Sequence, residues 1–112
     1  MDTMTESDYL NQIQATLDAL EEYVEELDED IDMKSSDGML TLLFPSGEQL
    51  ILNRQRAAHQ LWLATPEQGL HFDFDTEQDN WMEDREGRSI DTVLSEEFST
   101  LLDRDISIQL AE

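Results

Sequence analysis

The stretch that decides the fold covers residues 39–53, MLTLLFPSGEQLILN. On each side of its Pro–Ser–Gly centre, apolar residues recur at every second position. The residues that share this phase are Leu40, Leu42, Phe44, Leu50 and Leu52. A period of two is typical of a strand with one buried face, and Pro, Ser and Gly favour a turn. The stretch therefore predicts a β-hairpin with one face in the core.

Further short segments with strand-like composition lie on both sides of this hairpin, separated by polar or glycine-containing turns. We expect them at 32–35, 60–65, 70–75 and 80–84, with the second hairpin strand running to Gln55. Because connections this short join antiparallel neighbours, the chain predicts one antiparallel sheet of five or six strands. Ile106, Ile108 and Leu110 also alternate and predict a short terminal strand.

The N-terminal segment has a helical period instead. Its apolar stripe is Leu10, Ile13, Leu17, Leu20, Val24 and Leu27, with Tyr9 and Tyr23 beside it. Steps of three and four residues place such a stripe on one buried face. Thr3 with Glu6 has the form of a capping box, and Thr5 is a competing N-cap. The sequence thus predicts a long first helix that begins near one of these threonines.

A second helix is predicted from about residue 89 to residue 103, with Ser89 as its N-cap. Its stripe is Ile90, Val93 or Leu94, Phe98, Leu101 and Leu102. Two amphipathic helices at the ends of the chain can cover the same face of the sheet. We therefore expect an α+β two-layer sandwich, formed by a single domain over residues 1–112, with the opposite sheet face open to solvent.

Composition narrows the classes of partner. The chain has 112 residues, a net charge of −22 and no cysteine. This charge repels phosphate backbones and anionic lipid, so nucleic acid and membrane surfaces are poor partners, whereas metal cations and basic protein surfaces are good ones. The N-terminus shows no signal peptide and no apolar run reaches the length of a membrane span, so we expect a cytoplasmic protein.

The acid is concentrated in residues 18–32, DALEEYVEELDEDID. Carboxylates near a helix C-terminus cost about 0.3–1 kcal/mol each, because that end already carries partial negative charge. Such breaks of a local rule tend to mark functional sites. Two interpretations stay open: a site for cations or for a basic partner, and a solvated face of a very acidic protein.

An EF-hand does not explain this run. Asp28, Asp30 and Asp32 have the spacing of the first three ligands, but Met33 stands where that loop needs glycine and Met39 where it needs glutamate. What remains is an open array of hard oxygen ligands without His or Cys. Such an array suits iron, manganese, calcium or magnesium, bound weakly and with little selectivity.

Trp62 is the main candidate for protein contact. Leu61 and Leu63 share one face of their strand, so Trp62 points to the other, which the helices leave bare. Gln60 has the same phase, and Asn53 and Gln55 point outward from the neighbouring strand. Tryptophan is enriched at binding hot spots, which favours a contact surface over a Trp that merely shields backbone hydrogen bonds.

The sequence contains no motif that is typical of an enzyme active site. There is no phosphate-binding glycine loop, no nucleophile elbow and no zinc motif. His59 and His71 stand beside no serine and carboxylate in a recognisable pattern, and each is read as a surface or hydrogen-bonding residue.

Three stretches together resemble the bacterial frataxin family, the CyaY proteins. They are LILNRQRAAHQLWLA at 50–64, GLHFDFD at 69–75 and WMEDREG at 81–87. The resemblance implies the frataxin fold and a role in iron–sulfur cluster assembly. It also implies weak binding of Fe²⁺ and Fe³⁺, and binding to the cysteine desulfurase and the scaffold protein on which clusters form.

The resemblance also implies two sets of site residues. The metal-binding set, called the acidic ridge below, is Glu21, Glu22, Glu25, Glu26, Asp28, Glu29, Asp30 and Asp32. The partner-binding set on the open sheet face is Asn53, Gln55, Gln60 and Trp62.

Three functions are then in competition. The first is an iron-binding regulator of cluster assembly, as iron donor or iron sensor, that is a monomer and forms oligomers with iron. The second is a metal-independent acidic contact module, an adaptor or nucleic-acid mimic that occupies a basic surface. The third, an iron oxidase or mineral store, needs paired metals, and an open ridge does not supply them.

Overall fold

The protein is described here by a computed structural model that covers residues 4–110. The elements in chain order are α1 (Glu6–Glu26), β1 (Asp32–Ser36), β2 (Met39–Leu43), β3 (Gln49–Gln55), a 3-10 turn (Arg56–Ala58), β4 (Gln60–Ala64), β5 (Gly69–Asp75), β6 (Asn80–Glu83) and α2 (Ile90–Leu102).

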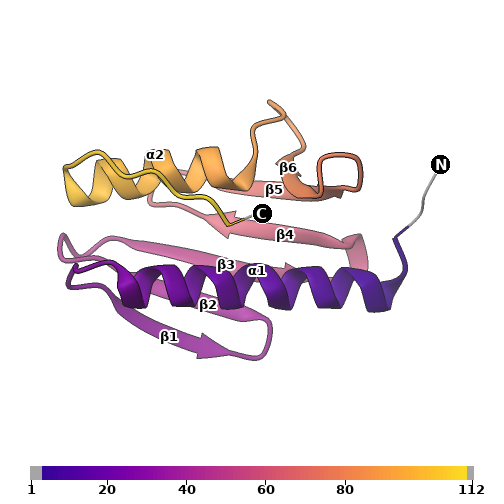
Figure 1. Cartoon of the computed structure of the whole chain (residues 1–112), viewed down its shortest axis with the longest axis horizontal. Helices are drawn as coiled ribbons and strands as arrows, with labels where there is room; N and C mark the ends of the chain where they lie inside the picture. The colour runs from indigo at the N-terminus through magenta and orange to yellow at the C-terminus, as the bar shows by residue number, and fades with distance from the viewer. Residues whose placement is uncertain (1–3, 111–112) are drawn as a thin grey trace.

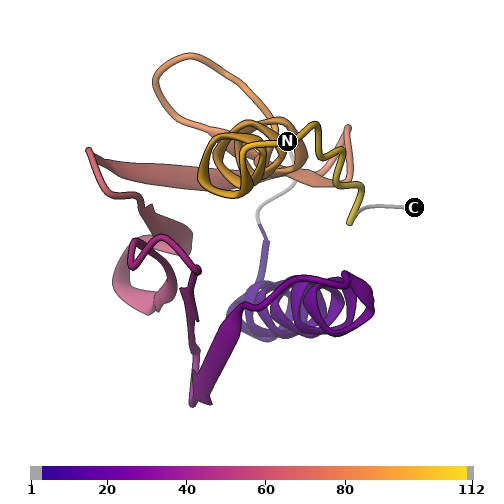
Figure 2. The ribbon, with the colours of Figure 1, turned by 90° about the vertical axis from the view of Figure 1, so that its left-hand side faces the viewer.

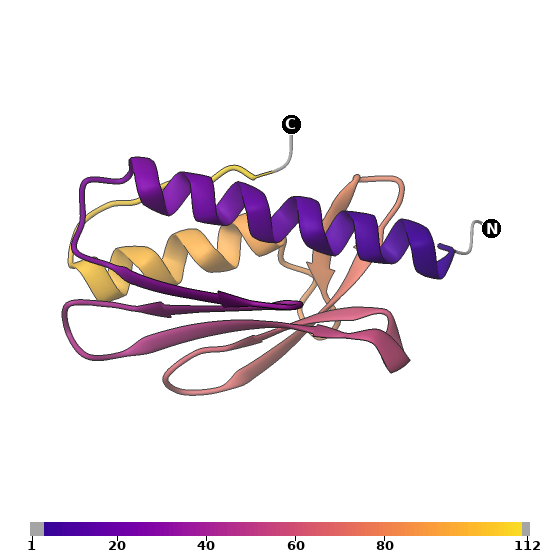
Figure 3. The same cartoon turned by 90° about the horizontal axis from the view of Figure 1, so that it is seen from below.

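The six strands form one antiparallel sheet in the order of the sequence, β1 to β6. Both helices lie side by side on the same face of this sheet (Figures 1 and 3). A view along the helices shows the sheet curving round them, with its other face bare (Figure 2). The predicted α+β sandwich is confirmed, including the short first strand.

The core lies between the helices and the inner face of the sheet. The inward strand residues that are buried include Leu40, Leu42, Leu50, Leu52, Leu61, Leu63, Leu70, Phe72 and Trp81. Full burial of a large apolar side chain contributes about 1.5–3 kcal/mol, so this layer is the main source of stability. The Trp81 indole N–H donates to Thr16 Oγ1 at 3.0 Å, which satisfies the one polar atom that this side chain buries.

Helix α1 begins after Thr5, whose side-chain oxygen accepts from the Asp8 N–H at 3.0 Å. The alternative cap, Thr3, lies outside the described residues. The buried stripe is Tyr9, Ile13, Leu17, Leu20 and Val24. Tyr9, predicted to flank the stripe, is fully buried, whereas Leu10 is only half-buried.

A contact between distant segments explains the position of Tyr9. Its hydroxyl donates to the Gln60 carbonyl at 2.7 Å, and its ring stacks on His59 with centroids 4.8 Å apart. A tyrosine that can bury its ring and still place its hydroxyl on a partner is well suited to a core edge. Sequence periodicity alone does not reveal such a partner 51 residues away.

The predicted terminal strand is wrong. Residues 105–110 have no strand, although Ile106 and Ile108 are buried. The tail lies along α2, where alternate backbone N–H groups reach side chains one helical turn apart. The Ile106, Ile108 and Leu110 N–H groups donate to Ser99 Oγ, Ser95 Oγ and Asp91 Oδ2 at 2.8, 2.8 and 3.1 Å. These acceptors take the place of a neighbouring strand.

An ion pair joins β6 to α2. Glu83 is 4% exposed and accepts from Arg88 Nε at 3.2 Å, and Arg88 also donates to Glu96 on α2 at 2.8 Å. A buried carboxylate is tolerated only with such a partner. Within residues 4–110, neither helix has the length and apolar character that crossing a bilayer requires.

A second group of carboxylates meets at the other end of α2. A hollow of about 120 Å³ is lined by Glu48, Glu67 and Glu97, which come from two turns and the helix. Burial raises the pKa of Glu97, and the charges of Glu67 and Glu96 raise it further. Negative charge on Glu97 therefore opposes folding at neutral pH.

The serines of α2 give a first test of the fold. We expect Ser95→Ala and Ser99→Ala each to lower the free energy of unfolding by about 1 kcal/mol, because each leaves a half-buried N–H of the tail without its acceptor. Ser107→Ala, at an exposed position, should change it by less than about 0.5 kcal/mol. Urea unfolding measures the differences. Equal values for all three variants would show that the tail does not depend on these bonds.

The pKa of Glu97 gives a second test. When folding raises the pKa of a carboxyl, the free energy of unfolding of the protein falls as the pH rises above the ordinary pKa of that group, which is 4.5 for glutamate. Glu97→Gln should therefore raise the melting temperature at pH 7, by the equivalent of less than about 1 kcal/mol because the group is only half-buried. The gain should vanish near pH 4. Glu96→Gln, which loses its ion pair with Arg88, should show no such gain.

Candidate iron and partner surfaces

The acidic ridge crosses from α1 into β1. Helix α1 ends at Glu26, with Leu27 as its C-cap, so Glu21, Glu22, Glu25 and Glu26 lie on its last turns. The connection carries Asp28, Glu29 and Asp30, and Asp32 begins β1. The ridge therefore combines a helix end, a loop and the start of an edge strand, at one end of the molecule (Figure 1).

Most ridge side chains face solvent without a basic partner. Glu21 and Glu29 are half-buried and the other six are exposed. Within residues 4–110, Glu29 is the one ridge carboxylate with an ion pair, which it forms with Arg104. The last turn of α1 contains no basic residue. The helix C-terminus and these carboxylates thus add up to an uncompensated negative surface.

The ridge does not form a compact metal cage. Across the described part of the chain, no three His, Asp or Glu side chains converge closely enough to hold one ion. The oxygen donors fit hard cations such as iron in their chemistry, but each ion would keep most of its water. Binding would follow charge density, and so would be weak and sensitive to ionic strength.

The partner-binding set lies together on the bare face of the sheet. Strand register places Asn53 opposite Trp62, and Gln55 opposite Gln60, across the β3–β4 pair. Trp62 is half-buried between the fully buried Leu61 and Leu63 of its own strand. All four side chains therefore occupy one patch that the helices do not cover.

Two neighbours hold Trp62 in place. Its indole N–H donates to Gln60 Oε1 at 2.8 Å, and its ring stacks on His71 of β5 with centroids 4.4 Å apart. His71 Nδ1 lies 3.6 Å from an Asp84 carboxylate oxygen. The sequence predicts that His71 is a surface or hydrogen-bonding residue and does not predict its stacking on Trp62. Its outward phase was the available signal, but its pairing with Trp62 depends on strand register.

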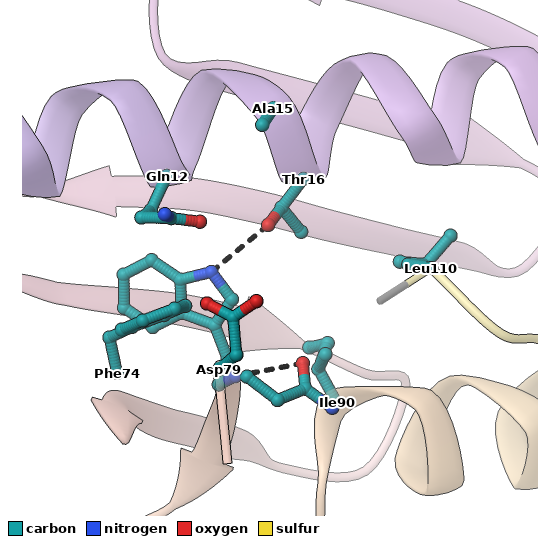
Figure 4. A pocket seen from close by; sticks show the side chains of 9 residues that line it. Gln12, Ala15, Thr16, Phe74, Asp79, Ile90 and Leu110 are labelled. Carbon is teal, nitrogen blue, oxygen red and sulfur yellow. Dashed lines mark hydrogen bonds between the residues drawn. The ribbon is translucent and has the colours of Figure 1, made fainter. Parts of the chain in front are cut away.

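One hollow away from both surfaces carries no catalytic set. It has a volume of about 160 Å³ and is bounded by α1, the β5–β6 turn, the start of α2 and the tail (Figure 4). Its lining is Gln12, Ala15, Thr16, Phe74, Asp79, Asn80, Trp81, Ile90 and Leu110. This set lacks a nucleophile beside a base, and the Thr16 hydroxyl is occupied by the Trp81 indole.

Comparisons with known proteins agree with the fold and with the resemblance. A family model described as "Frataxin-like domain" matches residues 2–104. The iron-sulfur cluster assembly protein CyaY of Thioalkalivibrio sulfidiphilus is 48% identical over 86 residues, which cover 75% of this chain and 80% of that protein. CyaY of Pseudomonas entomophila is 37% identical over 107 residues, covering 92% and 97%.

Two solved structures extend the comparison. The frataxin of Psychromonas ingrahamii superposes with a TM-score of 0.84 at 32% identity, over 97% of this chain and 100% of that one. A trimeric frataxin from the yeast Saccharomyces cerevisiae, described as complexed with ferrous, has a TM-score of 0.67 at 28% identity, over 93% and 91%.

The position of the ridge predicts a cost in stability. Glu25→Gln and Glu26→Gln should each raise the free energy of unfolding by about 0.3–1 kcal/mol at low salt, because each removes a negative charge from a helix C-terminus. Both gains should shrink in 0.5 M salt. Glu29→Gln is the matched control, since it breaks the pair with Arg104 and should give no gain. Gains of the same size at all three positions would mean that only net charge matters.

Proposed function

The chain belongs to the frataxin family, and on that premise we propose that it binds iron weakly along the acidic ridge and modulates iron–sulfur cluster assembly. The relatives reported above carry the name of iron-sulfur cluster assembly proteins. In this proposal the protein acts by binding rather than by catalysis. Its partners are the cysteine desulfurase and the scaffold protein, and iron sets how strongly it acts on them.

The observation that carries this proposal is the unpaired state of the ridge. Carboxylates at Glu25, Glu26, Asp28 and Asp30 are exposed, and in the described residues none of them has a basic partner. They weaken the helix end that bears them. A cation or a basic partner surface would remove this repulsion when it binds. Binding would therefore also stabilise the fold.

The bare sheet face supplies the second contact. Trp62, Gln60 and Asn53 offer an aromatic and amide surface of the kind found at the centre of protein interfaces. We propose that the ridge meets a basic surface of the desulfurase while the Trp62 face meets the scaffold protein or the same complex. The two surfaces would then act together.

Iron should also change the state of association. At a net charge of −22, monomers repel one another strongly. Bound iron would neutralise the ridge, and we propose that oligomers then form. A yeast frataxin described as trimeric and complexed with ferrous is consistent with this proposal for a relative.

A metal-independent contact module is the second candidate. The name of the relatives, iron-sulfur cluster assembly protein, does not favour it. In this alternative, the ridge serves only to attract a basic surface. An anaerobic Fe²⁺ titration followed by amide line broadening separates the two: broadening confined to residues 21–32 supports the iron-binding regulator, and no localised response supports the contact module.

A variant with four neutralised ridge carboxylates tests the mechanism. It carries Glu25→Gln, Glu26→Gln, Asp28→Asn and Asp30→Asn. We expect its affinity for Fe²⁺ to fall by about tenfold or more, since the field of four charges is lost. Its effect on the rate of the desulfurase should disappear with it. Isothermal titration under anaerobic conditions and an assay of sulfide release measure the two effects.

A control variant has the same net charge as the ridge variant. It carries Glu48→Gln, Glu67→Gln, Glu77→Gln and Glu86→Gln, all outside the ridge. It should keep both iron affinity and the effect on the desulfurase within about twofold of the starting protein, because all eight ridge carboxylates remain in place. If the ridge variant still acted on the desulfurase like this control, the ridge mechanism would be refuted.

A further inference from the structure

The surroundings of Trp62 are more specific than a bare aromatic patch. Two cross-strand rows lie next to each other on the open face. In one row Trp62 pairs with His71, and in the other Gln60 pairs with Asp73. Residues two apart along a strand share a face, so these four side chains form one continuous surface.

Two consecutive hydrogen bonds cross this surface from Trp62 to Asp73. The Trp62 indole N–H donates to Gln60 Oε1 at 2.8 Å, and Gln60 Nε2 donates to Asp73 Oδ1 at 3.1 Å. The indole donor and one Gln60 donor are therefore already used. The second Asp73 oxygen has no partner among the hydrogen bonds of the described residues, and Asp73 is exposed. This series of hydrogen bonds therefore ends at Asp73, whose free oxygen can accept another hydrogen bond from solvent or a ligand.

The charges around the stack have the same sign. Asp84 lies 3.6 Å from His71 on the β6 side, and Asp73 lies beside it in the neighbouring row. The stack thus combines an indole held in one orientation with a carboxylate on each of two flanking side chains. A flat, positively charged group with several N–H donors complements this surface.

We propose that this surface binds an arginine side chain of the partner protein, with its guanidinium on the exposed surface of the Trp62 indole and an N–H group on the Asp73 carboxylate. This inference rests on the proposed function and names the chemistry of the contact. A single Gln60 amide separates the indole nitrogen from Asp73 along these hydrogen bonds. A guanidinium has several N–H donors, one of which can reach the free Asp73 oxygen while its plane lies on the indole ring.

Arginine fits this surface better than lysine. A guanidinium is planar, lies flat on aromatic rings and is weakly hydrated, whereas an ammonium is a compact, strongly hydrated point charge. Attraction to the ridge alone depends on charge and treats the two alike. A preference for arginine at Trp62 is therefore the signature that separates this contact from general attraction by a protein of net charge −22.

The test uses the whole chain and a one-residue probe. N-acetyl-arginine amide, N-acetyl-lysine amide and uncharged N-acetyl-citrulline amide are titrated at constant ionic strength while the indole N–H signals are followed by NMR. Trp81 is an internal control, since its indole N–H is bonded to Thr16 inside the fold. We expect the Trp62 signal to shift in a saturable way, with arginine binding about two- to fivefold tighter than lysine, and the Trp81 signal to stay in place.

Two variants with the same change in charge complete the test. Asp73→Asn should weaken arginine binding about twofold or more, because it removes the carboxylate that receives the guanidinium. Glu77→Gln, at an exposed position in the β5–β6 turn, should not weaken it. Equal affinity for the arginine and lysine probes, equal affinity for the arginine and citrulline probes, or no difference between the two variants would each overturn the proposal.

This experiment contains no partner protein, iron or ridge variant. The arginine contact can therefore fail while the effect of the ridge on the desulfurase persists, and the ridge mechanism can fail while arginine selectivity at Trp62 persists.

Discussion

The whole molecule depends on one asymmetry in burial. A six-stranded sheet has two faces, and the chain supplies helices for only one of them. The apolar stripes of α1 and α2 cover the inward leucines and Trp81, which removes the main apolar surface from water. The other face stays in solvent, so any large side chain on it must be supported by its neighbours. Trp62 is therefore available for contact because the core needs only one side of the sheet.

The acidic ridge and the core have opposite effects on the stability of the fold. The core stabilises the fold, whereas the ridge opposes it by placing carboxylates at the negative end of α1. Glu29 is compensated by Arg104, but the exposed carboxylates around it are not. A surface of this kind has free energy to release when a cation or a basic protein arrives. In the proposed function, the same carboxylates that weaken the isolated protein would strengthen its complexes.

The weak iron binding that we propose would suit a regulatory role. A cage of converging ligands would hold iron tightly and make release slow, but the described part of the ridge spreads its oxygen atoms over a helix end, a loop and a strand. Such a surface exchanges cations readily and responds to their concentration. The preorganised Trp62 surface behaves oppositely, because Gln60 and His71 fix it before any partner binds. In the proposed function, the ridge would respond to the concentration of iron and the Trp62 surface would recognise the partner protein.

Periodicity, turn chemistry and charge are local properties, and from them the sequence by itself determined the α+β sandwich, the inward leucines, the outward direction of Trp62 and the presence of the ridge. Contacts between distant residues were decided only by the tertiary structure. Tyr9 entered the core because a carbonyl 51 residues away accepts its hydroxyl. The alternating tail became a strap on α2 rather than a strand, because serine and aspartate side chains accept its N–H groups. His71 joined the Trp62 surface through strand register, which pairs residues nine positions apart and which no single strand encodes.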